Sequence, residues 1–359
     1  MSEPVPPRRT LLLRTAEDGS PSPALTQAAE LLRASELVAF PTETVYGLGA
    51  DATNAEAARG IFIAKERPYS DPLIVHLPDA GQLASVAAQV PDMARQLAER
   101  FWPGPLTLVL PRAERIPAIV AGGGQTVGVR VPSHPVARAL LRTAGIPVAA
   151  PSANRFMHTS PTTAQHVLAD LDGRIAAILD GGPCTVGVES TVLDLTTDPP
   201  RVLRPGGVTL EELRAVLPQV EGPWASAAPE TDAGPVRAPG QMARHYAPRT
   251  RLVVFAARGA AALAAMRREA MRAMEHGERV GALLADEEAA ALSDLPLIVA
   301  RLGPGNDLAE ISRRLYAALR ALDEQDLDVI LAHTFGHEGL GLALEDRLRR
   351  AAGGELRMP

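Results

Sequence analysis

Residues 37–49 read LVAFPTETVYGLG: an apolar run over 37–40 stops at Pro41 and is followed by hydroxyl, carboxylate and glycine residues. Apolar runs of this length, bounded by turn-forming residues, are typical of β-strands. Further runs of this kind occur at 73–77, 106–110, 127–131, 176–179 and 191–195. Helical patterns lie between several of them, at 54–65, 91–101, 135–143 and 162–171. The sequence therefore predicts an α/β domain of about 215 residues.

Strand and helix patterns alternate more regularly after residue 251. Strands are predicted at 251–255, 279–285, 297–300 and 328–333. Between them lie a long helix that ends near His276, a short helix and a helix over 308–322, and a last helix is expected over 345–352. This βαβαβαβα order favours a small, parallel, doubly wound sheet.

Residues 218–250 separate the two patterns. This stretch has little apolar periodicity and is rich in Pro, Ala, Gly and Ser, which is the composition of a linker. We therefore expect one domain over 1–217 and a second over 251–359.

The composition excludes several classes of protein. No apolar run approaches the roughly 18 residues of a membrane-spanning helix. The N-terminal residues MSEPVPPRRT lack the apolar core of a signal peptide, so we expect a cytoplasmic protein. The single cysteine, Cys184, excludes an intramolecular disulfide and a metal site with several thiolates. A net charge of −6 argues against a uniformly basic surface for nucleic acid.

Common catalytic signatures are missing from the chain, which has no P-loop, G-x-G-x-x-G, HExxH, CxxC or G-x-S-x-G pattern. What remains is a series of polar clusters at the ends of predicted strands. Thr42 and Thr44 precede two glycines and either bind a ligand or cap a turn from strand to helix. Ser152 and Asn154 either bind phosphate or ribose oxygens or cap a following helix.

Three basic residues stand out from the rest. Lys65 is the one lysine among 36 basic residues, which points to a role that a guanidinium does not fill. Arg67 follows it in a loop stiffened by Pro68 and Pro72. Cations fixed in this way suit a polyanion, or they stabilise the end of a helix. Arg130 lies on a predicted buried strand and needs an anionic partner, either an internal carboxylate or a substrate carboxylate.

The order of the clusters is more specific than any one of them. The segments FPTETVYGLGADATN (40–54), KERPYSDPLIVH (65–76), GVRVPSHPVA (128–137), APSANRF (150–156), GVESTVLDL (187–195) and LRPGGVT (203–209) closely resemble the YrdC/Sua5 family. The two-domain Sua5 branch is favoured by APGQMARHYAP (238–248) and GLGLALEDRLRRAA (339–352), which extend the resemblance to almost the whole chain. The K-x-R and S-x-N signature of the family is present as Lys65, Arg67, Ser152 and Asn154.

The resemblance implies an L-threonylcarbamoyladenylate synthase, which converts L-threonine, bicarbonate (or CO2) and ATP, with Mg²⁺, into threonylcarbamoyl-AMP and pyrophosphate. The product would serve N6-threonylcarbamoyladenosine formation at position 37 of tRNAs that read ANN codons, completed by a separate transferase complex. The implied fold is a twisted open α/β sheet with a positively lined central cavity. The resemblance further implies a linker that folds over this cavity and a second domain with a Rossmann-like fold.

The resemblance also implies two groups of ligand-binding residues. The L-threonine pocket would be formed by Thr44, His76, Arg130, the backbone at Ala150, and Ser190, with Arg130 as the carboxylate clamp. ATP would be bound by Lys65, Arg67, Asp71, Thr126, Ser152, Asn154, Ser160 and Arg204, and Tyr246 would close over the nucleotide. Because no activated nucleophile is evident, we expect Lys65 and Arg67 to act catalytically through positioning and electrostatics.

One departure from the family pattern is visible. Family members commonly continue S-A-N-R with F-G-R, whereas here Phe156 is followed by Met157 and His158, so we expect no phosphate contact from position 158. The main alternative function is a module that binds double-stranded RNA or tRNA without catalysis, with strongly salt-dependent affinity. A weaker alternative is a hydrolase of acyl or carbamoyl phosphates.

Overall fold

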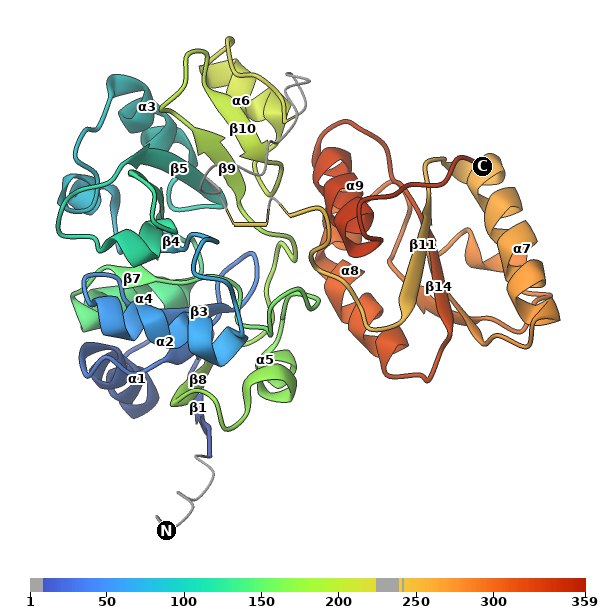
Figure 1. Cartoon of the computed structure of the whole chain (residues 1–359), viewed down its shortest axis with the longest axis horizontal. Helices are drawn as coiled ribbons and strands as arrows, with labels where there is room; N and C mark the ends of the chain where they lie inside the picture. Colours follow the sequence, from blue (N-terminus) through green and yellow to red (C-terminus); the bar gives the residue numbers. More distant parts are fainter. Residues whose placement is uncertain (1–8, 224–238, 241) are drawn as a thin grey trace.

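The computed structural model describes residues 9–223, 239–240 and 242–359, which form two α/β domains lying side by side (Figure 1). Part of the predicted linker, 224–238 and 241, lies outside the described residues. The N-terminal domain contains β1 (Leu11–Arg14), α1 (Pro23–Arg33), β2 (Val38–Phe40), β3 (Gly47–Asp51), α2 (Ala55–Lys65), β4 (Ile74–His76), α3 (Asp92–Phe101), β5 (Leu106–Pro111), β6 (Thr126–Arg130), α4 (Pro135–Ala144), β7 (Val148–Ala149), α5 (Ala164–Leu171), β8 (Ala177–Asp180), β9 (Thr191–Asp194), β10 (Arg201–Arg204) and α6 (Leu210–Val216). The C-terminal domain contains β11 (Arg251–Phe255), α7 (Gly259–Glu275), β12 (Val280–Leu284), β13 (Ile298–Arg301), α8 (Leu308–Asp323), β14 (Val329–His333) and α9 (Leu340–Ala351).

The N-terminal strands form one mixed, ten-stranded sheet in the order β1-β8-β2-β3-β7-β4-β6-β5-β9-β10. Strands β4 and β6 are parallel neighbours, and their register places His76 directly opposite Arg130. Strand β7 pairs antiparallel with both β3 and β4 and brings the segment that follows it beside them. Loops that are far apart in the sequence therefore meet near the middle of the sheet.

Most predicted elements are confirmed to within one or two residues. For the segment after residue 40, the sequence left open whether Thr42 and Thr44 bind a ligand or cap a turn from strand to helix, and the second alternative is wrong. Residues 47–51 form β3, which pairs antiparallel with β2. The glycines serve close packing inside the sheet: a Cβ at Gly49 would lie 2.9 Å from both the Phe40 ring and Val148. The strands β1 and β10 and the helices α1 and α6 carry weaker patterns and were not predicted from the sequence.

Helix α2 shows how local sequence positions the K-x-R pair. Asn54 caps the helix by accepting hydrogen bonds from the backbone amides of Glu56 and Ala57. The helix ends at Lys65, and Glu66 adopts a left-handed conformation with φ of 58°. This reversal separates the directions of the Lys65 and Arg67 side chains.

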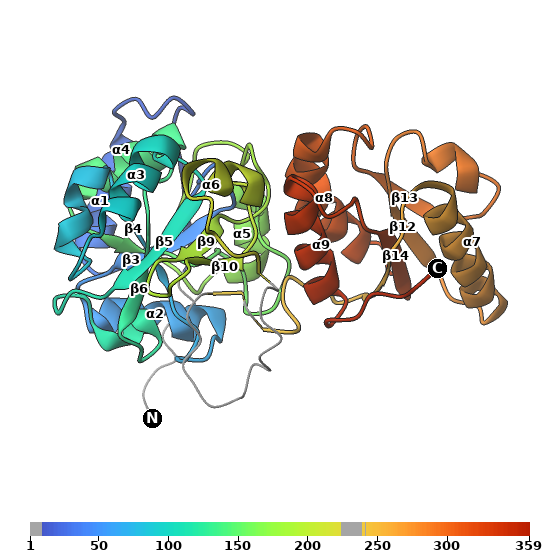
Figure 2. The ribbon, with the colours of Figure 1, turned by 90° about the horizontal axis from the view of Figure 1, so that it is seen from above.

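The C-terminal domain is a parallel sheet in the order β11-β14-β12-β13, as the alternation of patterns predicts. Helices α8 and α9 lie on the side of this sheet that faces the N-terminal domain, and α7 lies on the far side (Figure 2). Val45 and Val188 of the N-terminal domain share a buried apolar cluster with Leu315 and Tyr316 of α8. Helix α9 begins five residues before the predicted start. Among the described helices, none is both long and apolar enough to span a membrane.

Candidate active site

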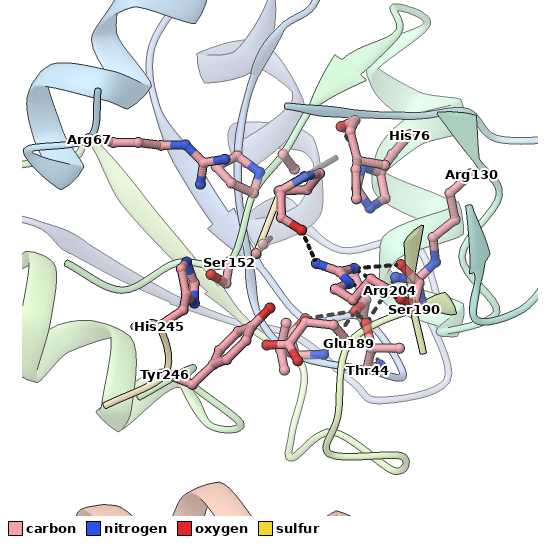
Figure 3. A pocket seen from close by; sticks show the side chains of 18 residues that line it. Thr44, Arg67, His76, Arg130, Ser152, Glu189, Ser190, Arg204, His245 and Tyr246 are labelled. Atoms are coloured by element: carbon pink, nitrogen blue, oxygen red, sulfur yellow. Dashed lines mark hydrogen bonds between the residues drawn. The ribbon is translucent and has the colours of Figure 1, made fainter. Parts of the chain in front are cut away.

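A pocket in the N-terminal domain collects residues from almost every polar cluster of the sequence (Figure 3). Its walls come from the β2–β3 turn, β4, β6, the segment after β7, the segment before β9, the end of β10 and the linker. The described residues that line it are Thr42, Thr44, Val45, Gly47, Arg67, Ile74, His76, Arg130, Ala150, Pro151, Ser152, Glu189, Ser190, Arg204, Pro239, Gly240, His245 and Tyr246. Arg67 and Arg130 reach it from opposite sides (Figure 3).

Every residue predicted for the L-threonine pocket lines this cavity: Thr44, His76, Arg130, Ala150 and Ser190. Arg130 is buried, and its Nη2 lies 2.6 Å from the Glu43 carboxylate. The same guanidinium donates from Nη1 to the Thr44 hydroxyl at 2.9 Å and from Nε to the Gly104 carbonyl at 3.2 Å. The sequence left two possible partners for Arg130, an internal carboxylate or a substrate carboxylate, and the structure shows the internal one, Glu43. Because a guanidinium carries five N–H donors, Arg130 retains donors for a ligand beside Glu43.

His76 is held neutral in the pocket wall. Burial, and then the nearby Arg130 guanidinium, lower the pKa of His76 to about 3. Its Nδ1 lies 3.1 Å from the Ile74 carbonyl, which can only accept, so Nδ1 carries the proton and Nε2 is an acceptor. The side chain suits an uncharged contact to a substrate amine or hydroxyl.

Arg67 lines the pocket, whereas Lys65 lies behind its wall. The Lys65 Nζ donates to the backbone carbonyls of Ser152 and Asn154, each at 2.5 Å, and the residue is 1% exposed. Burial, followed by the adjacent Arg67, lowers the pKa of Lys65 well below its usual range. Arg67 pairs with the Asp71 carboxylate at 3.0 Å. The two cations therefore bind segments outside α2, namely the S-x-N turn and the loop after α2.

The remaining residues predicted to bind ATP divide into two sets. Ser152, Arg204 and Tyr246 line the pocket with Arg67. The others, like Lys65, do not line it: Asp71 pairs with Arg67, Asn154 donates to the carbonyls of Arg155 and His158, Ser160 donates to Glu189, and Thr126 begins β6 at the end opposite Arg130. His158 lines a separate cavity with Arg320 and Asp170.

Glu189 is a buried carboxylate that the sequence prediction missed. Its Oε1 accepts from the Ser160 hydroxyl at 2.6 Å, and its Oε2 accepts from Tyr316 at 2.8 Å and from Arg347 Nε at 2.6 Å. Burial alone would raise the pKa of Glu189, but the Arg347 and Arg204 guanidiniums and these hydrogen bonds lower it to about 2. The motif G-V-E-S-T contains this residue, yet nothing in that motif indicates partners in the other domain.

The linker contributes His245 and Tyr246 to the pocket wall. The Tyr246 ring lies 4.0 Å from that of His245 and 6.0 Å from that of Tyr316, measured between centroids, and the Arg347 guanidinium lies 5.0 Å from its centre. The Tyr246 hydroxyl points into the pocket and has no hydrogen-bond partner among the described residues (Figure 3). Such a buried hydroxyl is available to a polar ligand.

The described residues contain no group of three His, Cys, Asp or Glu side chains placed to bind a metal. Glu189 is the one carboxylate among the described lining residues, and Ser160, Tyr316 and Arg347 already occupy its oxygens. Magnesium sites in nucleotide enzymes combine a few carboxylates with the phosphates of the substrate. The protein side chains described here do not form such a site by themselves.

Comparisons with known proteins show the family to which the chain belongs. The Sua5/YciO/YrdC family model, described as telomere recombination, matches residues 30–206, and a model for the C-terminal domain of threonylcarbamoyl-AMP synthase matches 208–353. Curated threonylcarbamoyl-AMP synthases from Bacillus subtilis and Pyrococcus abyssi are each 43% identical, over 95% and 91% of this chain and 96% and 93% of their own lengths. The crystal structure of P. abyssi Sua5 complexed with L-threonine matches with a TM-score of 0.89 and 41% identity, covering 98% of this chain and 99% of that one. The chain therefore belongs to the Sua5 branch of the YrdC/Sua5 family, that of the threonylcarbamoyl-AMP synthases.

Proposed function

We propose that the protein is an L-threonylcarbamoyladenylate synthase that converts L-threonine, bicarbonate and ATP into threonylcarbamoyl-AMP, pyrophosphate and water. The observation that carries this proposal is one pocket with the buried Arg130 on one side and the buried Arg67 on the other (Figure 3). Two separated guanidiniums suit two anionic groups, the carboxylate of an amino acid and a polyphosphate. The P. abyssi relative, which was solved with L-threonine, supports the first assignment.

The threonine end would be formed around Arg130. Its planar guanidinium, oriented by Glu43 and Thr44, would bind the substrate carboxylate. His76 Nε2 would accept a hydrogen bond from the amino or hydroxyl group, because the ring is neutral. In this position the neutral substrate amine can add to CO2, forming the N–C bond of a carbamate and releasing one proton to solvent. With bicarbonate the same carbamate forms, and the C–O bond that breaks releases water instead of a proton.

The phosphate end would be formed around Arg67 and Arg204, which lie within the same pocket as Ser152. A carbamate oxygen would attack the α-phosphorus in line, and the bond to the pyrophosphate oxygen would break. The guanidiniums would stabilise the charge that develops on the phosphate oxygens. Lys65 would position the S-x-N turn, and the approach of a triphosphate would favour its protonated form. We propose that Mg²⁺ arrives with ATP, bound through the phosphates.

The linker would exclude water from the reaction. His245 and Tyr246 cover one side of the pocket and are themselves buried. A carbamate and a mixed anhydride both hydrolyse readily, so a closed wall would protect them until the product leaves. The product would serve threonylcarbamoylation of tRNA adenosine 37 by a separate transferase complex, and we therefore place the reaction in the cytoplasm.

The test is pyrophosphate release from ATP by the purified chain. We expect release only when L-threonine and bicarbonate are both present, together with a new product that contains AMP and threonine by mass spectrometry. Pyrophosphate release that does not require L-threonine, or hydrolysis of an acyl phosphate without ATP, would contradict the proposal. Salt-sensitive retention of tRNA with no pyrophosphate release would instead support the RNA-binding alternative.

A further inference from the structure

The C-terminal domain reaches the wall of the active site through one fully buried arginine. Arg347, on α9, has a side chain with 0% exposure and binds Glu189 in the pocket wall, 158 residues earlier in the chain. Its Nη2 donates to the Pro205 carbonyl at 2.9 Å, next to Arg204. The same guanidinium lies over the Tyr246 ring. Arg347 therefore contacts three parts of the wall at once: the segment before β9, the end of β10 and the linker.

A second helix of the C-terminal domain acts on the same region. Tyr316, on α8, donates its hydroxyl proton to Glu189. Arg320, one turn further along α8, pairs with Asp170 at 2.7 Å and donates to the backbone carbonyls of Thr159 and Ser160. Both the backbone and the hydroxyl of Ser160 are thus held by groups that the C-terminal domain supplies or fixes.

This network sets the hydrogen-bonding character of Ser160. A carboxylate only accepts, so the Ser160 hydroxyl donates its single proton to Glu189 at 2.6 Å. Ser160 is itself fully buried and does not line the pocket, so its hydrogen bond holds Glu189, which does line it.

We propose that Arg347 is a positioning residue for the nucleotide: it fixes Glu189, the Pro205 carbonyl beside Arg204 and the Tyr246 ring, so that the C-terminal domain completes the ATP side of the site. This inference deepens the proposed synthase function and rests on it. The threonine end depends on a different set of contacts, made by Arg130 with Glu43, Thr44 and Gly104. Ser190 of the threonine pocket accepts hydrogen bonds from Arg204, so the two ends are not fully separate, and loss of Arg347 is expected to weaken ATP binding more than threonine binding.

The experiment compares substitutions in the full-length chain. We expect Arg347→Ala to raise the KM for ATP at least about fivefold while the KM for L-threonine changes less than about twofold. Arg347→Lys, which keeps a charge but not the fork that joins Glu189 to Pro205, is expected to recover only part of the loss. Tyr316→Phe removes one donor to Glu189 and retains the ring, so it provides a milder variant if Arg347→Ala does not fold.

Glu288→Gln is the matched control within the C-terminal domain. Glu288 is bound to buried His333 at 2.9 Å, and neither residue lines the pocket. Its substitution perturbs a buried pair of the same domain and is expected to leave both KM values unchanged. If a variant only lost folded protein, its apparent kcat would fall, but its KM for ATP would not rise relative to its KM for L-threonine.

Equilibrium binding separates failure of this inference from failure of the proposed function. The dissociation constant for ATP, measured by calorimetry on the unmodified chain and on the Arg347→Ala and Tyr316→Phe variants, does not depend on turnover. A weaker affinity for ATP in both variants supports the inference even if the chain releases no pyrophosphate. Unchanged ATP affinity, or an equal rise of both KM values, would overturn it.

Discussion

The Arg130 guanidinium lies 2.6 Å from the Glu43 carboxylate, and both side chains are almost completely buried. A buried arginine without an anionic partner would destabilise the fold, so Glu43 compensates the charge of Arg130 and also orients the guanidinium. The Thr44 hydroxyl, 2.9 Å from Nη1, fixes a second direction. The substrate carboxylate would therefore meet a cation that is already aligned rather than one that must reorganise.

Arg130→Lys is expected to raise the KM for L-threonine about tenfold or more, which corresponds to about 1.4 kcal/mol or more. A lysine ammonium is a compact point charge without the planar set of N–H donors of a guanidinium. It therefore cannot hydrogen-bond Glu43, Thr44 and the substrate carboxylate at the same time in the geometry that Arg130 provides. The KM for ATP is expected to stay within about twofold. Initial rates of pyrophosphate release, with each substrate varied in turn, measure both values. Arg59→Lys, on the exposed surface of α2, is the control, and an equal rise of both KM values would count against the assignment.

Lys65→Met is expected to lower both stability and turnover. The substitution leaves the buried carbonyls of Ser152 and Asn154 without their donor, at a cost of about 2 kcal/mol in the free energy of unfolding. Turnover is expected to fall at least about tenfold at a temperature where the variant is folded, because the S-x-N turn loses its anchor. Urea unfolding followed by circular dichroism, together with pyrophosphate release, tests both expectations. Retention of full activity would refute this role for Lys65.

Glu189 is expected to make the protein sensitive to acid. Its pKa is about 2 in the folded chain, against an ordinary value of 4.5, so the unfolded chain binds the proton more readily. The contribution to stability is fully present above pH 4.5 and is lost as the pH falls from 4.5 to 2, on the order of 3 kcal/mol in all. Urea unfolding at a series of pH values should show the stability difference between the parent and Glu189→Gln shrinking across this window. Parallel curves would disprove the expectation.

Met157→Gly is expected to stabilise the protein by about 0.5 to 1 kcal/mol. Met157 has φ of 67°, a left-handed conformation that a side chain disfavours and glycine adopts freely. The backbone bond from the Ala247 amide to the Met157 carbonyl, 2.8 Å, does not depend on the side chain. Met157→Ala removes the same side chain without relieving the backbone, and it provides the control. A gain in the alanine variant equal to that in the glycine variant would show that the backbone conformation is not the cause.

Several features of the site were predictable because their signals are local. Lys65, Arg67, Ser152 and Asn154 stand at strand and helix ends that hydrophobic periodicity marks, and their order along the chain carries the family resemblance. Every residue predicted for the threonine pocket lines one cavity. For the segment after Phe40, the alternative of a turn from strand to helix is wrong, because its glycines lie between two closely packed strands.

The sequence by itself determined the strand and helix segments, the two α/β patterns and the identity of the polar clusters, since periodicity and turn chemistry act over a few residues. Only the tertiary structure decided that Lys65 lies behind the pocket while Arg67 lines it, because the left-handed Glu66 between them reverses the chain. It also decided that Arg347 reaches Glu189 across 158 positions. Contacts of this kind depend on how elements far apart in the sequence pack together. The spacing of residues along the chain does not indicate which buried charged side chains will be neighbours.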